Sequence, residues 1–369
     1  MSELSYLEKL LDGVEVEWKT LGTVIKTVTA SSKLKSQDYR ASGKLPIVDQ
    51  GIKFIAGYTD EDVTPIEAGK YIIFGDHSEH IKYVDFPFVQ GADGLKILSP
   101  ISANAKYIYH AFLKFYKKEL SYKRHWSAAQ QTLIPIPCPD NPEKSLAIQS
   151  EIVRILDKFT ELTAELTAEL SMRKKQYNYY RDQLLNLDGR ENTREMRIGD
   201  IYDFQYGTGN TIPKSGGQYP VYGSNGIVGS HDKYNSEDSP VIGHIGAYAG
   251  IVNWGQGKHF VTYNGVICRH KSKEVLQKYA YYLLLLQDFG SKSNSASQPF
   301  VSYNILNAPI VLVPPLQEQA RIVAILDKFD TLTNSITEGL PREIELRQKQ
   351  YEYYRDLLFS FPKPETVSN

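Results

Sequence analysis

The stretch Q-S-E-I-V-R-I-L-D-K-F at residues 149–159 returns as Q-A-R-I-V-A-I-L-D-K-F at residues 319–329. Further along, Y-N-Y-Y-R-D at residues 177–182 returns as Y-E-Y-Y-R-D at residues 351–356. Each pair of blocks follows a longer stretch that is less similar between the two halves. A duplicated chain is expected to fold with pseudo-two-fold symmetry, and such a body suits a ligand or partner that comes in two halves.

Both repeats are predicted to be long helices, because their apolar residues alternate at spacings of three and four, as in the seam of a coiled coil. Nothing in residues 151–187 breaks the first helix, which at ~1.5 Å per residue would be roughly 55 Å long. In the second repeat Gly339-Leu340-Pro341 is expected to interrupt the helix. We expect the two helices to pair antiparallel through Ile152, Ile155, Phe159, Leu162, Leu166, Tyr177 and Tyr180 in the first repeat, and Ile322, Ile325, Phe329, Leu332, Tyr351 and Tyr354 in the second.

The first helix contains a tandem four-residue unit, Thr-Ala-Glu-Leu at residues 163–166 and again at residues 167–170. Each unit is slightly more than one helical turn, or ~6 Å. Gaining or losing one unit changes the helix length and keeps leucine near the same face. The simpler interpretation is that the tandem unit only forms a stable helix. The functional interpretation, which we favour, is that it acts as a ruler, so that the number of units sets the length of the helix.

The parts before the repeats read as two distant copies of an α+β head. Short β-branched and aromatic runs broken by glycine and asparagine predict strands, for example at residues 71–75, 240–243 and 265–268. One late helix is expected in each head, near residues 106–116 and 275–289, and the polar segment 188–197 reads as a linker. We therefore divide the chain into a first head (1–147), a central helix (148–188), a second head (189–317), a C-terminal helix (318–360) and a tail (361–369).

Composition describes an ordinary globular protein of two or three domains, with 369 residues, 41% of them hydrophobic and 23% charged. The net charge of −1 differs from that of proteins that coat nucleic acid indiscriminately, which are usually basic. The two cysteines are far apart and no signal peptide or membrane span is visible, so we expect no disulfide and a cytoplasmic location. The 26 tyrosines suit either core packing or a recognition surface.

No catalytic set is recognisable. There is no Asn/Asp-Pro-Pro-aromatic loop of a methyltransferase and no phosphate-binding G-x-x-x-x-G-K-[ST] motif. Glu17-Trp18-Lys19 has the form of a nuclease site but lacks a preceding Pro-Asp, and Asp76, His77 and His80 lack further metal ligands. We therefore expect no catalytic residue, no metal and no cofactor bound by this chain, and interpret it as a binding protein.

The heads carry polar and basic loops with aromatic residues among them. Arginine and lysine anchor phosphates or read guanine, and asparagine and glutamine read adenine, although for any single residue a solvated loop is the simpler explanation. The candidate DNA-binding residues are Lys33, Lys35, Gln37, Tyr39, Arg40, His77, His80, Lys82, Lys123 and Arg124 in the first head, and Tyr206, Thr208, Lys214, Ser224, Asn225, His244, Tyr248, Lys292 and Asn294 in the second.

With these residues in view, the whole chain resembles the specificity subunit of a type I restriction–modification system. The features that carry the resemblance are the Thr-Ala-Glu-Leu tandem, the doubled Q-x-x-I-V-x-I-L-D-K-F and K-Q-Y-x-Y-Y-R-D blocks, and P-P-L-Q-E-Q at residues 314–319. The first copy departs from the pattern, because Lys144-Ser145-Leu146 replaces Pro-Pro-Leu.

The resemblance implies that each head is a target recognition domain that reads one half of a bipartite target in double-stranded DNA. It further implies that the helices set the gap and dock two modification subunits, which use S-adenosylmethionine to methylate adenine, and that restriction subunits add ATP- and Mg²⁺-dependent translocation and cleavage. The chain itself would catalyse nothing.

Two other classes of function stay open at the level of sequence. One is a nuclease with an unrecognised site, for which metal-dependent cutting by the purified chain would speak. The other is a scaffold that grips protein through its tyrosine-rich heads, against which DNA binding that falls steeply with salt would count.

Overall fold

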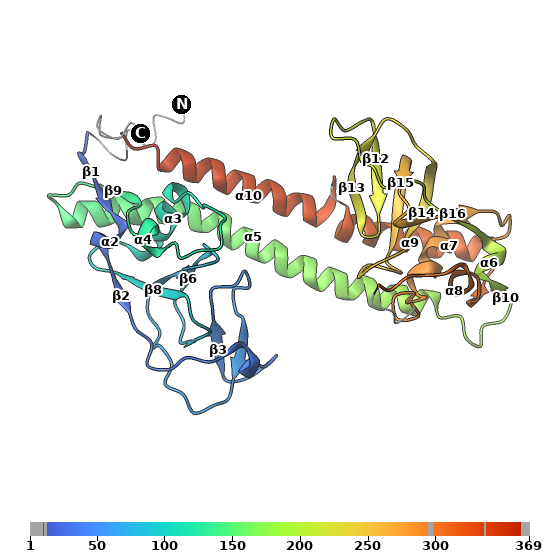
Figure 1. Ribbon diagram of the computed structural model, residues 1–369, viewed down its shortest axis with the longest axis horizontal. Coiled ribbons are helices and arrows are strands. Elements are labelled where there is room, and N and C mark those ends of the chain that lie inside the picture. Colours follow the sequence, from blue (N-terminus) through green and yellow to red (C-terminus); the bar gives the residue numbers. More distant parts are fainter. Residues whose placement is uncertain (1–9, 11–12, 294–297, 336, 363–369) are drawn as a thin grey trace. The chain divides into compact units, whose positions relative to one another are not determined.

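The computed structural model describes residues 10, 13–293, 298–335 and 337–362, and the chain divides into two compact units (Figure 1). The first unit comprises Met1–Leu166 and Ile344–Asn369, and the second comprises Thr167–Glu343. Each unit combines an α+β head with parts of the long helices, so the predicted fold class is confirmed. Among the residues that the structure describes, no helix is long and apolar enough to cross a membrane.

The first head is built on a four-stranded antiparallel sheet in the order β2-β8-β5-β6. Helix α3 packs against this sheet, and their buried side chains form one core. A three-stranded sheet β4-β3-β7 and a two-stranded sheet β1-β9 complete the head. The elements are β1 (Val16–Thr20), α2 (Leu21–Val24), β2 (Ile25–Val28), η1 (Ser36–Asp38), β3 (Leu45–Val48), β4 (Gly57–Thr59), β5 (Tyr71–Gly75), β6 (Ile81–Val84), β7 (Val89–Gln90), β8 (Leu95–Pro100), α3 (Ala105–Phe115), α4 (Trp126–Ala129) and β9 (Leu133–Pro137).

The second head repeats this plan with one larger sheet, in the order β11-β16-β14-β15-β12-β13. The long strand β15 pairs antiparallel with β14 and parallel with β12. In the first head two separate strands make these pairs, because β6 pairs antiparallel with β5 and β7 pairs parallel with β3. The elements are β10 (Arg194–Arg197), α6 (Ile198–Ile201), β11 (Tyr202–Tyr206), β12 (Tyr219–Gly223), β13 (Gly226–His231), β14 (Ser236–Gly243), β15 (Val252–Val261), β16 (Gly265–His270), α7 (Gln277–Leu285), α8 (Tyr303–Asn307) and β17 (Ile310–Val313).

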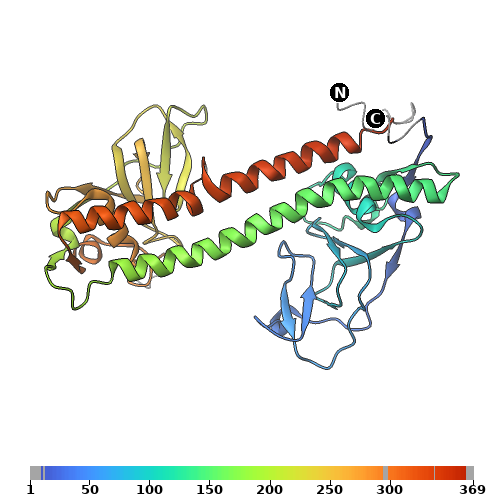
Figure 2. The ribbon, with the colours of Figure 1, turned by 180° about the vertical axis from the view of Figure 1, so that it is seen from behind.

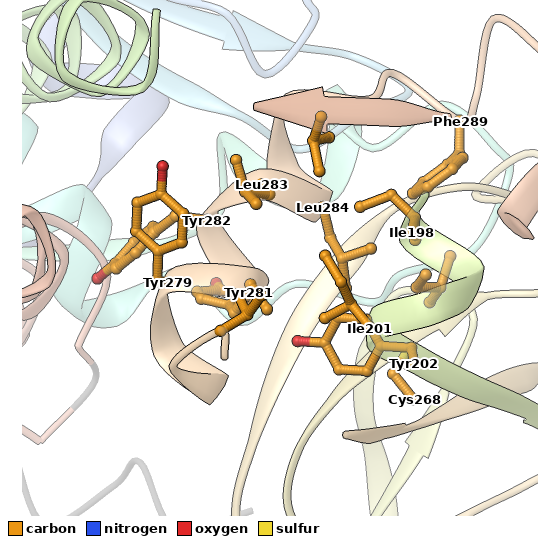
Figure 3. Close-up of a cluster of buried hydrophobic side chains, with 14 of the residues drawn as sticks. Ile198, Ile201, Tyr202, Cys268, Tyr279, Tyr281, Tyr282, Leu283, Leu284 and Phe289 are labelled. Carbon is orange, nitrogen blue, oxygen red and sulfur yellow. The ribbon is translucent and has the colours of Figure 1, made fainter. Parts of the chain in front are cut away.

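The core of the second head is rich in tyrosine (Figure 3). Side chains of α7, such as Leu284, lie with Ile201 of α6 and Cys268 of β16 in one buried cluster. Tyr279 and Tyr282 are also fully buried. Many of the tyrosines therefore serve packing, while others, described below, are exposed. Cys268 is buried and Cys138 half-buried, and both are free.

The repeated blocks lie in three long helices: α5 (Pro142–Leu185), α9 (Leu316–Asn334) and α10 (Gly339–Leu358). The uninterrupted first helix and the break before Gly339 are confirmed. In the first unit the last part of α10 lies beside the first part of α5 in both Figure 1 and Figure 2, and Phe159 stacks on Tyr354 with ring centroids 5.0 Å apart. In the second unit Tyr180 of α5 stacks in the same way on Phe329 of α9, at 5.6 Å.

One prediction about the connection between the central helix and the second head is wrong. Residues 194–197 belong not to a linker but to strand β10, which pairs antiparallel with β17 from Arg194↔Val313 to Arg197↔Ile310. The polar side chains that suggested a linker are those of a two-stranded ribbon, in which most side chains of β10 face solvent. The first head has the matching ribbon, β1 with β9.

Candidate nucleic-acid interface

In the first head, three strand ends are tied together by one side chain, Gln50, which follows β3. Its Nε2 donates to the carbonyl oxygen of Asp93, just before β8, over 3.0 Å. Its Oε1 accepts from the backbone N–H of His77, just after β5, over 3.2 Å. Gly94 has φ +92°, and a Cβ there would lie 2.9 Å from the Gln50 amide, so this close approach needs a glycine.

In the second head, the corresponding strand ends are held by Ser224, which follows β12. Its Oγ lies 2.9 Å from the carbonyl oxygens of both Ile245, after β14, and Asn264, before β16. The backbone repeats as well, because His244 N–H donates to Asn264 just as Asp76 N–H donates to Gly94. The two heads therefore hold the same three strand ends together with different residues, Gln50 in the first head and Ser224 in the second. We call this group of strand ends and their loops the platform of each head.

The candidates of segment 33–40 lie at or near this platform. Lys33 is exposed and its Nζ lies 3.1 Å from Asp93 Oδ1, while Arg40 is exposed and pairs with Asp60 at 3.5 Å. The hydroxyl of Tyr39 accepts from the backbone N–H of Ala92 over 2.9 Å, and burial raises its pKa. Lys35 and Gln37 are exposed on the same segment.

Lys82 requires a correction. Its side chain is buried, and its Nζ donates to the carbonyl oxygens of Asp49 and Lys53 at 2.7 and 2.6 Å. The ammonium group is thus used to hold the turn after β3, so we no longer assign it a contact with DNA. Burial, supported by the charges of Lys118 and Lys82, lowers the pKa of the half-buried His80.

The loop after α3 joins the same surface. His77 Nδ1 lies 3.2 Å from the carbonyl oxygen of Lys123, and the His77 ring stacks on Tyr122. Lys123 and Arg124 are both exposed. Segments 33–40 and 76–82 of the first head therefore meet through Gln50 and Asp93, which the sequence analysis did not single out, and segment 121–126 joins them at His77. Among the described residues there is no group of three or more His, Cys, Asp or Glu arranged to hold a metal ion.

In the second head, Tyr206 lies between two other rings. It stacks on His244 at 4.0 Å and on Tyr303 at 4.2 Å between ring centroids. His244 also needs a correction: it is buried, and its Nδ1 lies 3.0 Å from the carbonyl oxygen of Tyr263, so its ring supports the surface from below.

A pocket of about 330 Å³ opens at the strand ends that Ser224 holds together. It brings together the candidates Ser224, Asn225 and Tyr248 with two amides that the sequence analysis missed, Asn210 and Asn264. Amide side chains at a surface pocket have the donor and acceptor pair that matches the major-groove edge of adenine. The remaining candidates Thr208, Lys214 and Lys292 are exposed, and Asn294 lies outside the described residues.

An alignment of the two heads could have revealed the missed residues. Leu45-Pro46-Ile47-Val48 corresponds to Tyr219-Pro220-Val221-Tyr222, which places Gln50 opposite Ser224, each two residues after the aligned tetrapeptide. Both are polar side chains at the end of a predicted strand. That equivalence, more than residue type, identifies the platform.

The repeated residues dock each head onto its helix. Buried Gln149 accepts from the backbone N–H of Asn104 over 2.8 Å, and buried Gln319 accepts from the backbone N–H of Leu276 over 2.7 Å. Both bonds lie at the start of the head's late helix. In each head, one of the four N–H groups that a helix start leaves without an intrahelical partner is thus bound by a glutamine that the repeat keeps.

The repeated aspartates act about two helical turns later on the same helices. Lys106 Nζ lies 2.7 Å from Asp157 in the first unit, and Tyr282 donates to Asp327 over 2.5 Å in the second. Burial acts to raise the pKa of Asp157, but nearby His110 and Lys106 lower it overall. The carboxylate is therefore held in its charged form at the head–helix contact.

The predicted seam residues divide into two groups. Ile152 and Ile322 are fully buried and pack into the cores of the heads together with Leu156 and Leu326, which the seam pattern did not include. The stacked pairs Phe159–Tyr354 and Tyr180–Phe329 make contacts between the helices. Tyr177 is buried. The half-buried seam residues are Ile155, Phe159, Leu162, Leu166, Ile325, Phe329, Leu332, Tyr351 and Tyr354.

Comparison with known proteins gives a consistent set of matches. A family model described as the type I restriction modification DNA specificity domain matches residues 13–172 and again residues 190–346. The specificity subunit of the Escherichia coli type I restriction enzyme EcoR124I/EcoR124II is 45% identical over 413 aligned positions, covering 100% of both chains. The EcoprrI specificity subunit of Escherichia coli is 36% identical, covering 92% of this chain and 93% of that one.

A solved structure has the same fold. The crystal structure of the S subunit of a type I restriction–modification system from M. genitalium aligns with a TM-score of 0.62 at 18% identity. The alignment covers 95% of this chain and 98% of that one.

Proposed function

The chain belongs to the type I restriction–modification DNA specificity family, and on this premise we propose that each of its heads reads one half of a bipartite target in double-stranded DNA. The observation that carries the proposal is the pair of equivalent platforms, tied by Gln50 in the first head and by Ser224 in the second. One scaffold that presents different side chains in its two copies suits two different half-sites on one ligand.

The side chains at each platform have the chemistry for DNA. The first head offers Lys33, Lys123 and Arg124, which suit phosphates and guanine. The second offers the amides of Asn210, Asn225 and Asn264 around its pocket, which suit adenine. We propose that the first head relies more on charge and the second more on direct base reading.

The chemistry itself, in this proposal, belongs to partner subunits. Modification subunits would bind S-adenosylmethionine and methylate adenine, and restriction subunits would use ATP and Mg²⁺. The chain would bind, orient and select the target, and catalyse nothing. The tandem Thr-Ala-Glu-Leu unit of α5 would set the gap between the half-sites.

We further propose that two copies of the modification subunit dock on the chain, one on each unit. The support is a pair of exposed tyrosines kept in both repeats, Tyr179 and Tyr353, which are 61% and 51% exposed. Each lies edge-on against the next tyrosine of the helix, which in turn stacks on a phenylalanine. An exposed aromatic ring at the same position of both copies suits one partner surface that binds twice.

Mass measurement of the assembled complex tests this stoichiometry. Tyr179→Ala or Tyr353→Ala alone should leave complexes with one modification subunit, and the double variant should leave none at the same concentration. Met172→Ala, which also removes an exposed apolar side chain from α5, is the matched control and should bind two. Two subunits bound by the double variant would contradict the proposal.

Mapping of methylated adenine in cells that express this chain with its modification subunit tests the main proposal. A split motif with a fixed unspecified gap is the expected result and would identify both half-sites. Absence of modification with an active partner subunit would favour a protein-binding scaffold. Metal-dependent cutting by the chain alone would favour a nuclease.

A further inference from the structure

The segment Lys117–Arg124, between α3 and α4 of the first head, has an unusual surface. All eight residues are exposed; four are basic and one is acidic. Two large apolar side chains stand out among them, Leu120 at 85% and Tyr122 at 95% exposure. Exposed apolar side chains grouped with cations are typical of a surface that becomes covered by a ligand.

A buried carboxylate fixes the start of this segment. Glu79 is 1% exposed, and its Oε2 accepts from the Tyr116 hydroxyl over 2.7 Å and from the backbone N–H of Glu119 over 2.9 Å. Its Oε1 accepts from the backbone N–H of Leu120 over 2.8 Å. Burial acts to raise the pKa of Glu79, but these hydrogen bonds and nearby His125 lower it overall. Glu79 also has φ +56°, a conformation that a non-glycine residue adopts at a cost.

A second buried carboxylate fixes the end. Asp76 Oδ1 accepts from the backbone N–H groups of His125 and Trp126 over 3.0 and 2.8 Å. The buried His125 ring reaches back into the segment, with its Nε2 2.8 Å from the carbonyl oxygen of Ser121 and 3.5 Å from Glu79 Oε1. Two carboxylates, one at each end, thus hold an otherwise exposed loop in one conformation.

Within the described part of the second head, the position equivalent to Asp76 carries no carboxylate. There the backbone bond between the loop and the strand end is kept, since Val301 N–H donates to the carbonyl oxygen of His244 as His125 N–H donates to that of Asp76. The position of Asp76 is occupied by His244, whose ring packs against Tyr206. The carboxylate clamp is therefore a property of the first head, beyond what the shared scaffold requires.

We propose that residues 117–124 form an arm that enters a groove of the DNA half-site read by the first head, with Glu79 and Asp76 as positioning residues. This inference rests on the proposed function. Leu120 and Tyr122 would contact the bases, and Lys117, Lys118, Lys123 and Arg124 the phosphates on either side. The excess of cations favours DNA over a protein as the ligand. A clamped arm loses less conformational entropy on binding than a free loop, so its contacts contribute more to discrimination.

The test uses the complex of the chain with its modification subunits, and measures methylation and binding on duplexes in which each half-site is randomised in turn. Tyr122→Ala should reduce discrimination at one half-site by about tenfold or more and leave the other unchanged. Glu79→Gln, which keeps the shape and one acceptor, should act in the same direction on the same half-site. Lys117→Ala with Lys118→Ala should weaken binding to all sequences and reduce its salt dependence.

The second half-site, read by the other head in the same molecule, is the internal control for folding and assembly. Tyr122 is exposed, so the Tyr122→Ala result stands even where Glu79→Gln lowers stability. Wild-type discrimination at both half-sites by Tyr122→Ala overturns the arm. Loss of subunit assembly by Tyr122→Ala, with DNA binding of the chain unchanged, also overturns it and assigns the segment to a protein contact. Absence of bipartite recognition by the wild-type complex would instead defeat the proposed function.

Discussion

At the scale of single residues, the repeats are explained best by Gln149 and Gln319. Each is a buried amide that accepts the backbone N–H at the start of the late helix of its head. Gln149→Ala should leave that buried donor without an acceptor and lower the free energy of unfolding by about 1–3 kcal/mol. Thermal and denaturant unfolding monitored by circular dichroism measures the effect, and Gln319→Ala should behave alike.

The exposed Lys158→Ala is the matched control, because it lies on the same helix and is kept in both copies without being buried. Its effect should stay within about 0.5 kcal/mol. If Gln149→Ala were as stable as Lys158→Ala, the docking role of the amide would be refuted.

His110 gives the first unit a pH dependence that the second unit lacks at the equivalent place, where Tyr282 stands. His110 is buried beside Asp157, Lys106, Arg355 and Tyr351, and burial is the main cause of its lowered pKa. Below pH 6.5 the unfolded chain therefore takes up a proton that the folded chain does not. Folding stability should fall as the pH drops from 6.5, by up to about 1.4 kcal/mol for each unit of pKa lowering.

The variant His110→Gln should remove that part of the pH dependence while keeping a polar side chain beside the Tyr351 hydroxyl. Unfolding curves at pH 7 and pH 5 for both proteins provide the comparison. Equal loss of stability in the two proteins would show that His110 is not the group responsible.

Residue type alone predicted which segments are polar loops, but it did not show which of their side chains are exposed. The sequence placed Lys82 and His244 in polar loops, but burial decides their use, and both are occupied inside the heads. Gln50 was missed because a lone glutamine after a strand carries no local signal. Its role is visible where three strand ends meet in space, or when the two heads are aligned and Gln50 falls opposite Ser224.

At the scale of elements, the spacing of apolar residues predicted the long helices well. The stacked pairs Phe159–Tyr354 and Tyr180–Phe329 are seam residues that meet as the pattern indicated. The pattern failed to show that each helix also packs on a head. A stripe that serves two neighbours is wider than a seam, which explains why Leu156 and Leu326 are buried outside it.

The tandem Thr-Ala-Glu-Leu unit lies at a special place along α5. The boundary between the two compact units falls between Leu166 and Thr167, which is also the boundary between the two copies of the tetrapeptide. A further Thr-Ala-Glu-Leu after Leu170 would add ~6 Å of helix without altering either head. The unspecified gap of the DNA target should lengthen and both half-sites should stay the same, as read by methylation mapping.

Thr167→Ala, which alters the tetrapeptide and keeps its length, is the control and should leave the gap unchanged. An unchanged gap in the insertion variant would disprove the ruler. A change in either half-site would show instead that the helix influences how the heads read DNA.

At the scale of the whole molecule, duplication separates what is shared from what is free to vary. Each head meets its helix through the same glutamine and aspartate, but presents different loops on the same three strand ends. The contacts between head and helix therefore do not depend on which side chains the platform loops carry. That separation makes the heads exchangeable in principle.

Exchange of the second head for that of a relative should therefore change one half-site only. An exchange of residues 196–316, the less similar stretch before the second repeat, would cut strand β10, so the junctions should lie outside the β10–β17 pair. Gln319 and Asp327 should be retained, because they hold the second head on its helix. The gap should persist because α5 is untouched, and the first half-site should persist because Gln149 and Asp157 still hold the first head. Methylation mapping reads both half-sites in one experiment. If both changed together, recognition would be a joint property of the two heads, and the duplicated chain could not be divided into two independent readers.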